Sequence, residues 1–358
     1  MIFKSTIKLS LLIVIINSLS ACSTISYYSQ AIKGQIQLLL ARESIDKLIT
    51  AEDTSPELRE RLILIQAVRA YAQQDLHLPV GKAYASYADL ERPYAVWNIY
   101  AAPPLSLQAY TWCYPVVGCL AYRGYFNQQD AEKHAEQLKQ QSLEVRVGGV
   151  RAYSTLGFFN DPVLNTFIDT TEPYLVELLI HEITHRLLYI KGDTKFNESF
   201  ATAVAQIATQ RWYQQQDQAE KYAQYQAEET NDRLLRNLLL EHRNQLEKIY
   251  SDDTRSEPEK IDAKKQQIAQ MHEQYFTAKA AYGWRDGLDN WILSVNNASL
   301  ATMANYNGFV PAFKQIFEQQ GQDFPGFYQA VTRLSELKKV ERHAALEKLM
   351  SADVTPES

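Results

Sequence analysis

The chain has 358 residues, of which 46% are hydrophobic and 22% are charged, and this balance excludes a disordered chain and a protein with many membrane spans. Its formal net charge of -6 gives no support for binding to nucleic acid or to anionic lipid headgroups. Gly (13 residues) and Pro (12 residues) are scarce for this length, which favours helices over an all-β architecture.

The first 22 residues have the pattern of a secretory signal. Two lysines precede an apolar run over residues 9–16, and small residues then lead to Cys22. They resemble the lipobox of bacterial lipoproteins, in which Cys22 would be lipidated and become the first residue of the mature chain. An ordinary cleaved signal with an incidental cysteine is the alternative. Because Ser23 rather than an aspartate follows, we expect a lipid anchor in the outer membrane of a Gram-negative cell, facing the periplasm.

Helices and short strands alternate in the first part of the mature chain. Residues 27–74 carry apolar side chains at helical spacing, whereas residues 80–126 contain aromatic and β-branched runs broken by proline. We expect helices in the first region and short antiparallel strands in the second. A polar helix over residues 128–141 and a strand through Val145 and Val147 would complete a small mixed α/β layer.

Two cysteines remain after the signal, Cys113 and Cys119, in the stretch TWCYPVVGCL. An oxidising compartment favours a disulfide between them, and Pro115 and Gly118 suit a hairpin that brings the sulfurs together. A zinc knuckle would need further ligands that are not nearby. We predict a structural disulfide, with two free thiols as the alternative.

The rest of the chain is predicted to be helical. Apolar residues dominate residues 174–190, which indicates a buried helix. A charged helical stretch over residues 214–280, broken only near residues 251–259, indicates a long helical hairpin with solvated faces. The fold class expected is therefore α+β, mainly helical.

The buried helix carries His181-Glu182-Ile183-Thr184-His185. Histidines at i and i+4 share one helix face, so both imidazoles can reach a single zinc ion. Glu182 lies about 100° round the helix from His181, where it can act on water at the metal without ligating it. In a purely structural reading, the histidines would pack beside a buried, unpaired glutamate, which is costly. A metal site explains all three residues together.

Catalytic zinc normally takes three protein ligands and one water. Glu198 follows His185 after twelve residues, and a turn near Asp193 would return it to the metal on a second helix that opens at Asn197. We predict Glu198 as the third ligand and Asp193 as the alternative. Glu177, one turn before His181, is expected to lie behind the ligands or in solvent.

The pair HEITH and FNESFATAVAQ resembles the gluzincin metallopeptidases, whose second helix carries N-E-x-F-A in aminopeptidase N relatives and N-E-A in thermolysin relatives. Four further stretches, YYSQAIKGQ, YRGYF, AYSTLGFFNDPVLNT and VNNASLA, resemble a bacterial family described as putative aminopeptidases, so that the resemblance covers nearly the whole mature chain. It implies that His181, His185 and Glu198 bind zinc and that Glu182 is the general base and acid of peptide hydrolysis.

Gluzincins often stabilise the oxyanion with a tyrosine or histidine from a later segment, and Tyr306 is the candidate here, although packing or capping is the alternative for this residue. An extended peptide is expected to add to the strand before the zinc helix. The glycines of this strand permit close backbone approach, or else mark a simple bend. The residues predicted to bind substrate are Gly148, Gly149, Arg151, Tyr153, Asn296 and Asn297.

These observations divide the chain into five ranges: a signal peptide (1–21), an N-terminal helical and small α/β region (22–145), a zinc-binding catalytic core (146–213), the helical hairpin (214–280) and a C-terminal helical region that completes the active site (281–358).

The predicted function is zinc-dependent hydrolysis of peptide or protein substrates in the periplasm, by an aminopeptidase with endopeptidase activity. The stretch GGVRAYS lacks the carboxylate that aminopeptidase N relatives carry in G-x-M-E-N, so peptides with a blocked amino terminus are also expected to be cut; Asp161 is another acid that could hold the free amine. One alternative is a lipoprotein scaffold or assembly chaperone, with a protein partner on the hairpin and a structural or inactive metal site. Another is a hydrolase of a different amide, such as a cell-wall peptide.

Overall fold

The computed structural model describes residues 27–114, 118–152, 160–284, 286–303 and 308–352. The signal segment with Cys22, and the predicted site residues Tyr153 and Tyr306, lie outside these ranges. The structure is mainly helical with sheets of two or three strands, which confirms the α+β class. Within the described ranges, none of the helices is both long and apolar enough to span a membrane.

The N-terminal region is less continuous than the sequence suggests. Residues 27–40 are helical, but the strand β1 (Arg42–Ser44) and the short helix α2 (Ile45–Thr50) precede the long helix α3 (Pro56–Gln74). Helix α3 begins where the Ser55 hydroxyl accepts the Leu58 N–H, with proline in the first turn. Its buried face joins the largest hydrophobic core.

A three-stranded antiparallel sheet has β3 (Val96–Ala102) at its centre, β6 (Arg123–Tyr125) on one side and β7 (Glu144–Val150) on the other. Helix α4 (Gln128–Lys139) packs on this sheet and is capped by the side chain of Asn127. The strands expected between residues 80 and 150 are thus confirmed. Strand β7 is an edge strand, because β3 is its partner on one side and no described strand pairs with the other.

Two smaller sheets complete the layer. The strand β2 (Ser86–Ala88) pairs antiparallel with β1 and parallel with β8 (Val163–Leu164), which leads into the short helix α5 (Asn165–Ile168). Strands β4 (Trp112–Tyr114) and β5 (Gly118–Leu120) form a hairpin in which Cys113 and Cys119 face each other and are joined by a disulfide.

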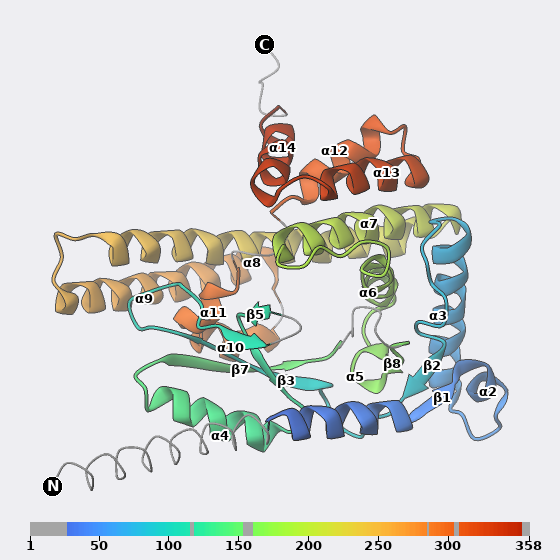
Figure 1. Cartoon of the computed structure of the whole chain (residues 1–358), viewed down its shortest axis with the longest axis horizontal. Coiled ribbons are helices and arrows are strands. Elements are labelled where there is room, and N and C mark those ends of the chain that lie inside the picture. Colours follow the sequence, from blue (N-terminus) through green and yellow to red (C-terminus); the bar gives the residue numbers. More distant parts are fainter. Residues whose placement is uncertain (1–26, 115–117, 153–159, 285, 304–307, 353–358) are drawn as a thin grey trace, which may run out of the picture.

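Helices α6 (Glu172–Thr184) and α7 (Thr194–Gln215) pack against each other (Figure 1). The predicted buried helix extended to residue 190, but α6 ends at Thr184, and His185 occupies its C-cap. Helix α7 begins three residues earlier than predicted, because the side chain of Asp193 caps it by accepting the Phe196 N–H.

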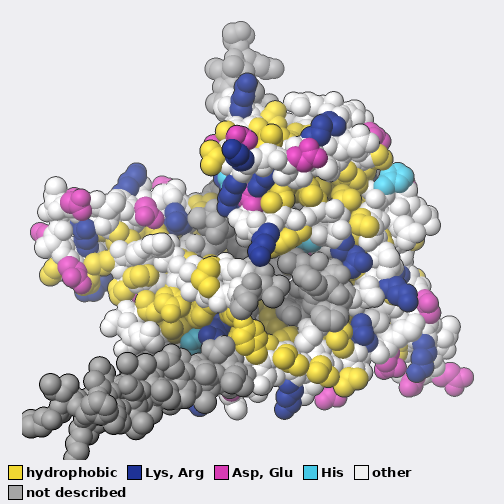
Figure 2. All heavy atoms as spheres, viewed as in Figure 1, with side chains coloured by type: hydrophobic (Ala, Val, Ile, Leu, Met, Phe, Trp, Pro, Cys, Tyr) yellow, Lys and Arg dark blue, Asp and Glu magenta, His cyan; other side chains and the backbone are white. Residues whose placement is uncertain are grey.

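The predicted hairpin is confirmed as α8 (Ala219–Ser251) and α9 (Glu257–Tyr282), which extend away from the rest of the molecule (Figure 1). Ser256 and Glu259 form a capping box at the start of α9, and Gly283 ends it in a left-handed conformation with φ of 66°. Basic and acidic side chains are interspersed over the outer hairpin, as expected for solvated faces (Figure 2).

The C-terminal elements pack in two places. The 3-10 turn η1 (Asp286–Leu288) and helices α10 (Asp289–Leu293) and α11 (Asn297–Ala301) lie against the hairpin and the β3–β7 sheet. Helices α12 (Val310–Gln319), α13 (Phe324–Ser335) and α14 (Lys339–Ala352) lie on the side of α7 opposite to α6 (Figure 1). The largest core therefore contains residues from Leu38 to Leu346.

Candidate metal centre

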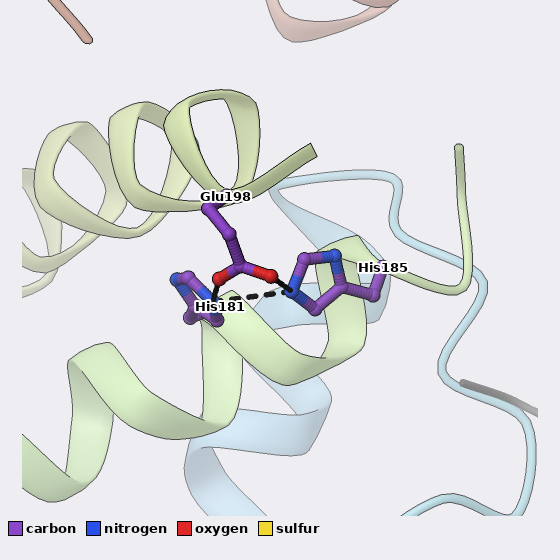
Figure 3. Close-up of side chains that lie close together, drawn as sticks. All are labelled: His181, His185 and Glu198. Atoms are coloured by element: carbon purple, nitrogen blue, oxygen red, sulfur yellow. Dashed lines mark hydrogen bonds and ion pairs between the residues drawn. The ribbon is translucent and has the colours of Figure 1, made fainter. Parts of the chain in front are cut away.

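Three potential ligands converge between α6 and α7 (Figure 3). The Nε2 atoms of His181 and His185 lie 3.1 Å apart. One carboxylate oxygen of Glu198 lies 3.3 Å from His181 Nε2, and the other lies 3.7 Å from His185 Nε2. Histidines on one turn of α6 and a glutamate in the first turns of α7 thus point into the same small volume.

This triangle has the dimensions of a zinc site. Zinc bonds of about 2.0–2.1 Å at tetrahedral angles would place neighbouring ligand atoms about 3.3 Å apart. The observed spacings of 3.1, 3.3 and 3.7 Å bracket that value. Two histidine nitrogens and one carboxylate are also a donor set that zinc prefers in catalytic sites. The three residues therefore fit a metal ion, and a catalytic zinc would keep its fourth position for water or substrate.

The electrostatics of the three side chains suit metal binding. Burial, followed by the nearby His181, lowers the pKa of His185 to about 4, so its imidazole is neutral at neutral pH. Burial also disfavours the charged forms of Glu198 and His181, but their mutual hydrogen bond and the neighbouring charges together outweigh it, which lowers the pKa of Glu198 and raises that of His181. A neutral imidazole and an ionised carboxylate are the forms that bind a metal, and the proton on His181 would leave when the metal binds.

Neighbouring residues fix the ligands. Thr202, one turn after Glu198 on α7, places its hydroxyl 3.5 Å from His181 Nδ1. The side chain of Asn197 accepts the Ile190 N–H and donates to the Ile190 carbonyl, which ties the loop between the helices to the start of α7. Such contacts orient the ligands before a metal binds.

Asp193, the alternative third ligand, serves a different purpose. Its carboxylate is 1% exposed and pairs with Arg342 at 2.6 Å and with His343 at 2.8 Å, both from α14. Despite burial, these partners lower the pKa of Asp193. Asp193 therefore connects α7 to the C-terminal helices, and the carboxylate beside the histidines is that of Glu198.

Glu177 lies one turn before His181 on α6 and is covered by α8. The Tyr225 hydroxyl donates to its carboxylate at 2.6 Å. Burial, with added repulsion from Glu229, raises the pKa of Glu177 to about 7. Glu177 is therefore half-buried beneath α8 and held by Tyr225.

The residues predicted along β7 have separate environments. A Cβ atom at Gly149 would lie 2.4 Å from the ring of Tyr94, so packing requires glycine at this position, whereas Gly148 has ordinary clearance. The Arg151 carbonyl accepts the Thr166 hydroxyl. This bond ties Arg151, one residue after β7, to α5, which precedes α6 in the chain.

The two asparagines predicted to bind substrate have structural contacts. Asn297 is fully buried, and its side-chain amide donates to the carbonyls of Pro103, Pro104 and Ser106 while accepting the Tyr250 hydroxyl. Substrate has no access to it, so this prediction is wrong. Asn296 caps α11 and donates to the Val145 carbonyl, which ties α11 to the edge strand.

The sequence analysis missed two side chains near the metal centre. The ring of Tyr189 lies 6.2 Å from that of His185, and burial together with Glu198 raises its pKa. Thr202 contacts His181, as described above. The i+4 spacing from Glu198 to Thr202 was a usable signal, because it places both on one face of α7. Tyr189 has the same i+4 spacing from His185, inside the range 174–190 predicted to be helical, so the same signal was available for it.

A family model described as "Putative aminopeptidase" matches residues 26–346 of this chain. No curated protein and no solved structure gives a match.

Proposed function

The chain belongs to the putative aminopeptidase family, and from this premise we propose that it is a zinc-dependent peptidase of the gluzincin type. The observation that supports the proposal most is the convergence of His181, His185 and Glu198, whose ligand atoms all lie within 4.8 Å of one another. The local order HEITH then assigns Glu182 a role that neither histidine can perform, because it lies beside the metal ligands on the same helix.

Zinc in this site would make a bound water acidic and would polarise the scissile carbonyl. The carboxylate of Glu182 takes the proton of the attacking water and delivers it to the leaving nitrogen. Glu198 and His185 hold their places because Asn197 and the Asp193 cap fix the start of α7. The donor to the oxyanion is proposed to be Tyr306, with Tyr189 beside His185 as the described alternative.

The range of substrates can be tested by comparing free and N-acetylated versions of one peptide library, with Glu182→Gln protein as the background. We expect both versions to be cut in a Glu182-dependent way, because the stretch GGVRAYS around the end of β7 carries Arg151 and no carboxylate. Mass spectrometry of the products identifies each cleaved bond. If acetylation abolishes all cleavage and free peptides lose single N-terminal residues, the protein is a strict aminopeptidase, and the proposed cleavage of blocked peptides is wrong.

We further propose that the peptidase acts outside the cytoplasm, tethered by lipid on Cys22. The disulfide between Cys113 and Cys119 supports an oxidising compartment. In cells fed a labelled fatty acid, the wild-type chain is expected to carry label, whereas Cys22→Ser should remain an unlabelled precursor. Cys113→Ser is the matched control and should keep its label. Equal labelling of Cys22→Ser and wild type would contradict the proposal that Cys22 carries the lipid.

A further inference from the structure

A cavity of about 700 Å³ lies between α7, α8 and α12. Its wall on α7 is formed by the side chains at positions 206, 207, 210, 211 and 214. At about 100° per residue, this face is centred about 150° round α7 from Glu198. The cavity therefore lies on a different face of α7 from Glu198, although Tyr225 in its wall donates to Glu177, one turn before His181 on α6.

The charge that lines this cavity is unbalanced. Four basic residues line it, and the acidic residues in its wall are two glutamates, Glu229 and Glu318. In the described part of the chain, no acidic side chain lies within ion-pairing distance of three of the basic residues, which are Arg233, Arg236 and Lys314. Glu229 attracts Arg236 and Lys314 from beyond ion-pairing distance, and Glu177 attracts Lys314, but the basic side chains still repel one another, and an anionic ligand between the two arginines would relieve that repulsion.

The fourth basic residue, Arg211, is held in place by its surroundings. Its guanidinium donates to the Gln322 carbonyl at 2.6 Å and lies 4.9 Å and 5.0 Å from the ring centroids of Phe317 and Phe324. Glu229 likewise accepts a hydrogen bond from Gln206 at 2.9 Å. The wall is thus fixed around Arg233 and Arg236, which both extend from α8 and remain available to a ligand.

The other side chains that line the cavity can hydrogen-bond to a peptide backbone and pack against its side chains. Glutamines at positions 206, 210, 214 and 226 provide side-chain amides, which can donate to and accept from peptide groups. Ile207, Tyr222 and Val310 add apolar and aromatic surface. The volume lies within the range of about 300–1,000 Å³ that small-molecule sites occupy, and it suits a peptide of a few residues.

We propose that this cavity is a second binding site, separate from the metal centre, which holds short peptides by their free C-terminal carboxylate on Arg233 and Arg236. The choice of a peptide as the anion rests on the proposed function, since a peptidase is surrounded by short peptide substrates and products. Planar guanidinium groups match a carboxylate in a bidentate manner, and two of them on one helix can share its two oxygens.

Isothermal titration calorimetry on the Glu182→Gln mature chain tests this site without hydrolysis. The two probes are tetra-alanine with a free C-terminal carboxylate and tetra-alanine amide. We expect the acid to bind at least about tenfold more tightly than the amide. The double variant Arg233→Gln, Arg236→Gln should remove this preference, and the Arg233→Lys, Arg236→Lys variant should restore part of it. Arg333→Gln, which removes one positive charge at an exposed position on α13, should leave it unchanged.

A carboxylate could also bind zinc, so each titration is repeated after chelation of metal. Equal binding of acid and amide would overturn the proposal, as would a preference that survives loss of both arginines. A preference that disappears on chelation would overturn it too, because the metal would then bind the carboxylate. If the arginine-dependent preference persists while the wild-type chain hydrolyses no peptide, the cavity site is supported and the proposed peptidase function is contradicted.

Discussion

Glu182→Gln is expected to lower kcat/KM for peptide hydrolysis by about 10²–10⁴-fold, the range for loss of a general base. Glutamine has nearly the same shape as glutamate but cannot accept the proton of the attacking water. The substitution does not alter the three residues that converge on the metal, so the fold and bound metal should be retained. Initial rates on one fluorogenic peptide, with circular dichroism of both proteins, measure the effect.

Glu177→Gln is the matched control for this prediction. It makes the same chemical change one turn earlier on α6, close to His181. Because burial raises the pKa of Glu177 to about 7, its carboxyl is partly protonated at pH 7, and glutamine can still accept the Tyr225 hydroxyl. We expect its kcat/KM to remain within about tenfold of wild type. An equal loss in both variants would show that local charge, and not proton transfer at Glu182, controls the rate.

The helices whose positions were predicted correctly carry their evidence in neighbouring residues of the sequence. The hairpin helices α8 and α9 and the helix α4 combine long helical periodicity with caps such as Asn127 and Ser256. The end of α6 was placed too late because Leu187 and Leu188 continue its apolar pattern from a turn that packs on the same core. Periodicity detects burial, but it does not distinguish the last turn of a helix from a buried loop that follows it.

The convergence of His181, His185 and Glu198 was predictable for a similar reason. His181, Glu182 and His185 lie within five consecutive residues of one helix, so their spacing alone places their side chains close to one another. Glu198 required a reversal of the chain, and twelve intervening residues allow few arrangements other than two adjacent helices. The grouping of the HEITH residues and the return of Glu198 to them both follow from helix geometry over a short stretch of sequence.

Other site assignments depended on contacts that are distant in sequence. The partners of Asp193, Arg342 and His343, come from the last helix, so a loop acid beside a metal motif looked like a ligand. Asn297 resembled an exposed polar residue, but its amide bonds to a loop almost 200 residues earlier. The cavity beside Arg233 and Arg236 likewise forms where three separate helices meet. One sequence alone holds no local pattern for such contacts.

The largest expected effect on metal content comes from the ligands themselves. His181→Ala, His185→Ala and Glu198→Ala each remove one of three protein ligands and leave too few to retain zinc through purification. Hydrolysis should fall to background in all three. Asp193→Asn is the control, because the structure assigns Asp193 to the buried pair with Arg342 rather than to the metal, so folded protein of this variant should keep its zinc.

The most direct test of the metal centre is the zinc content per chain of the purified mature protein, measured by inductively coupled plasma mass spectrometry after reconstitution and dialysis. The proposed site predicts close to one zinc per chain in the wild type and in Glu182→Gln, and a small fraction of that in folded His181→Ala, His185→Ala and Glu198→Ala. Equal zinc in the wild type and in the three ligand variants would contradict the assignment, as would a wild-type chain that hydrolyses peptides without binding any metal.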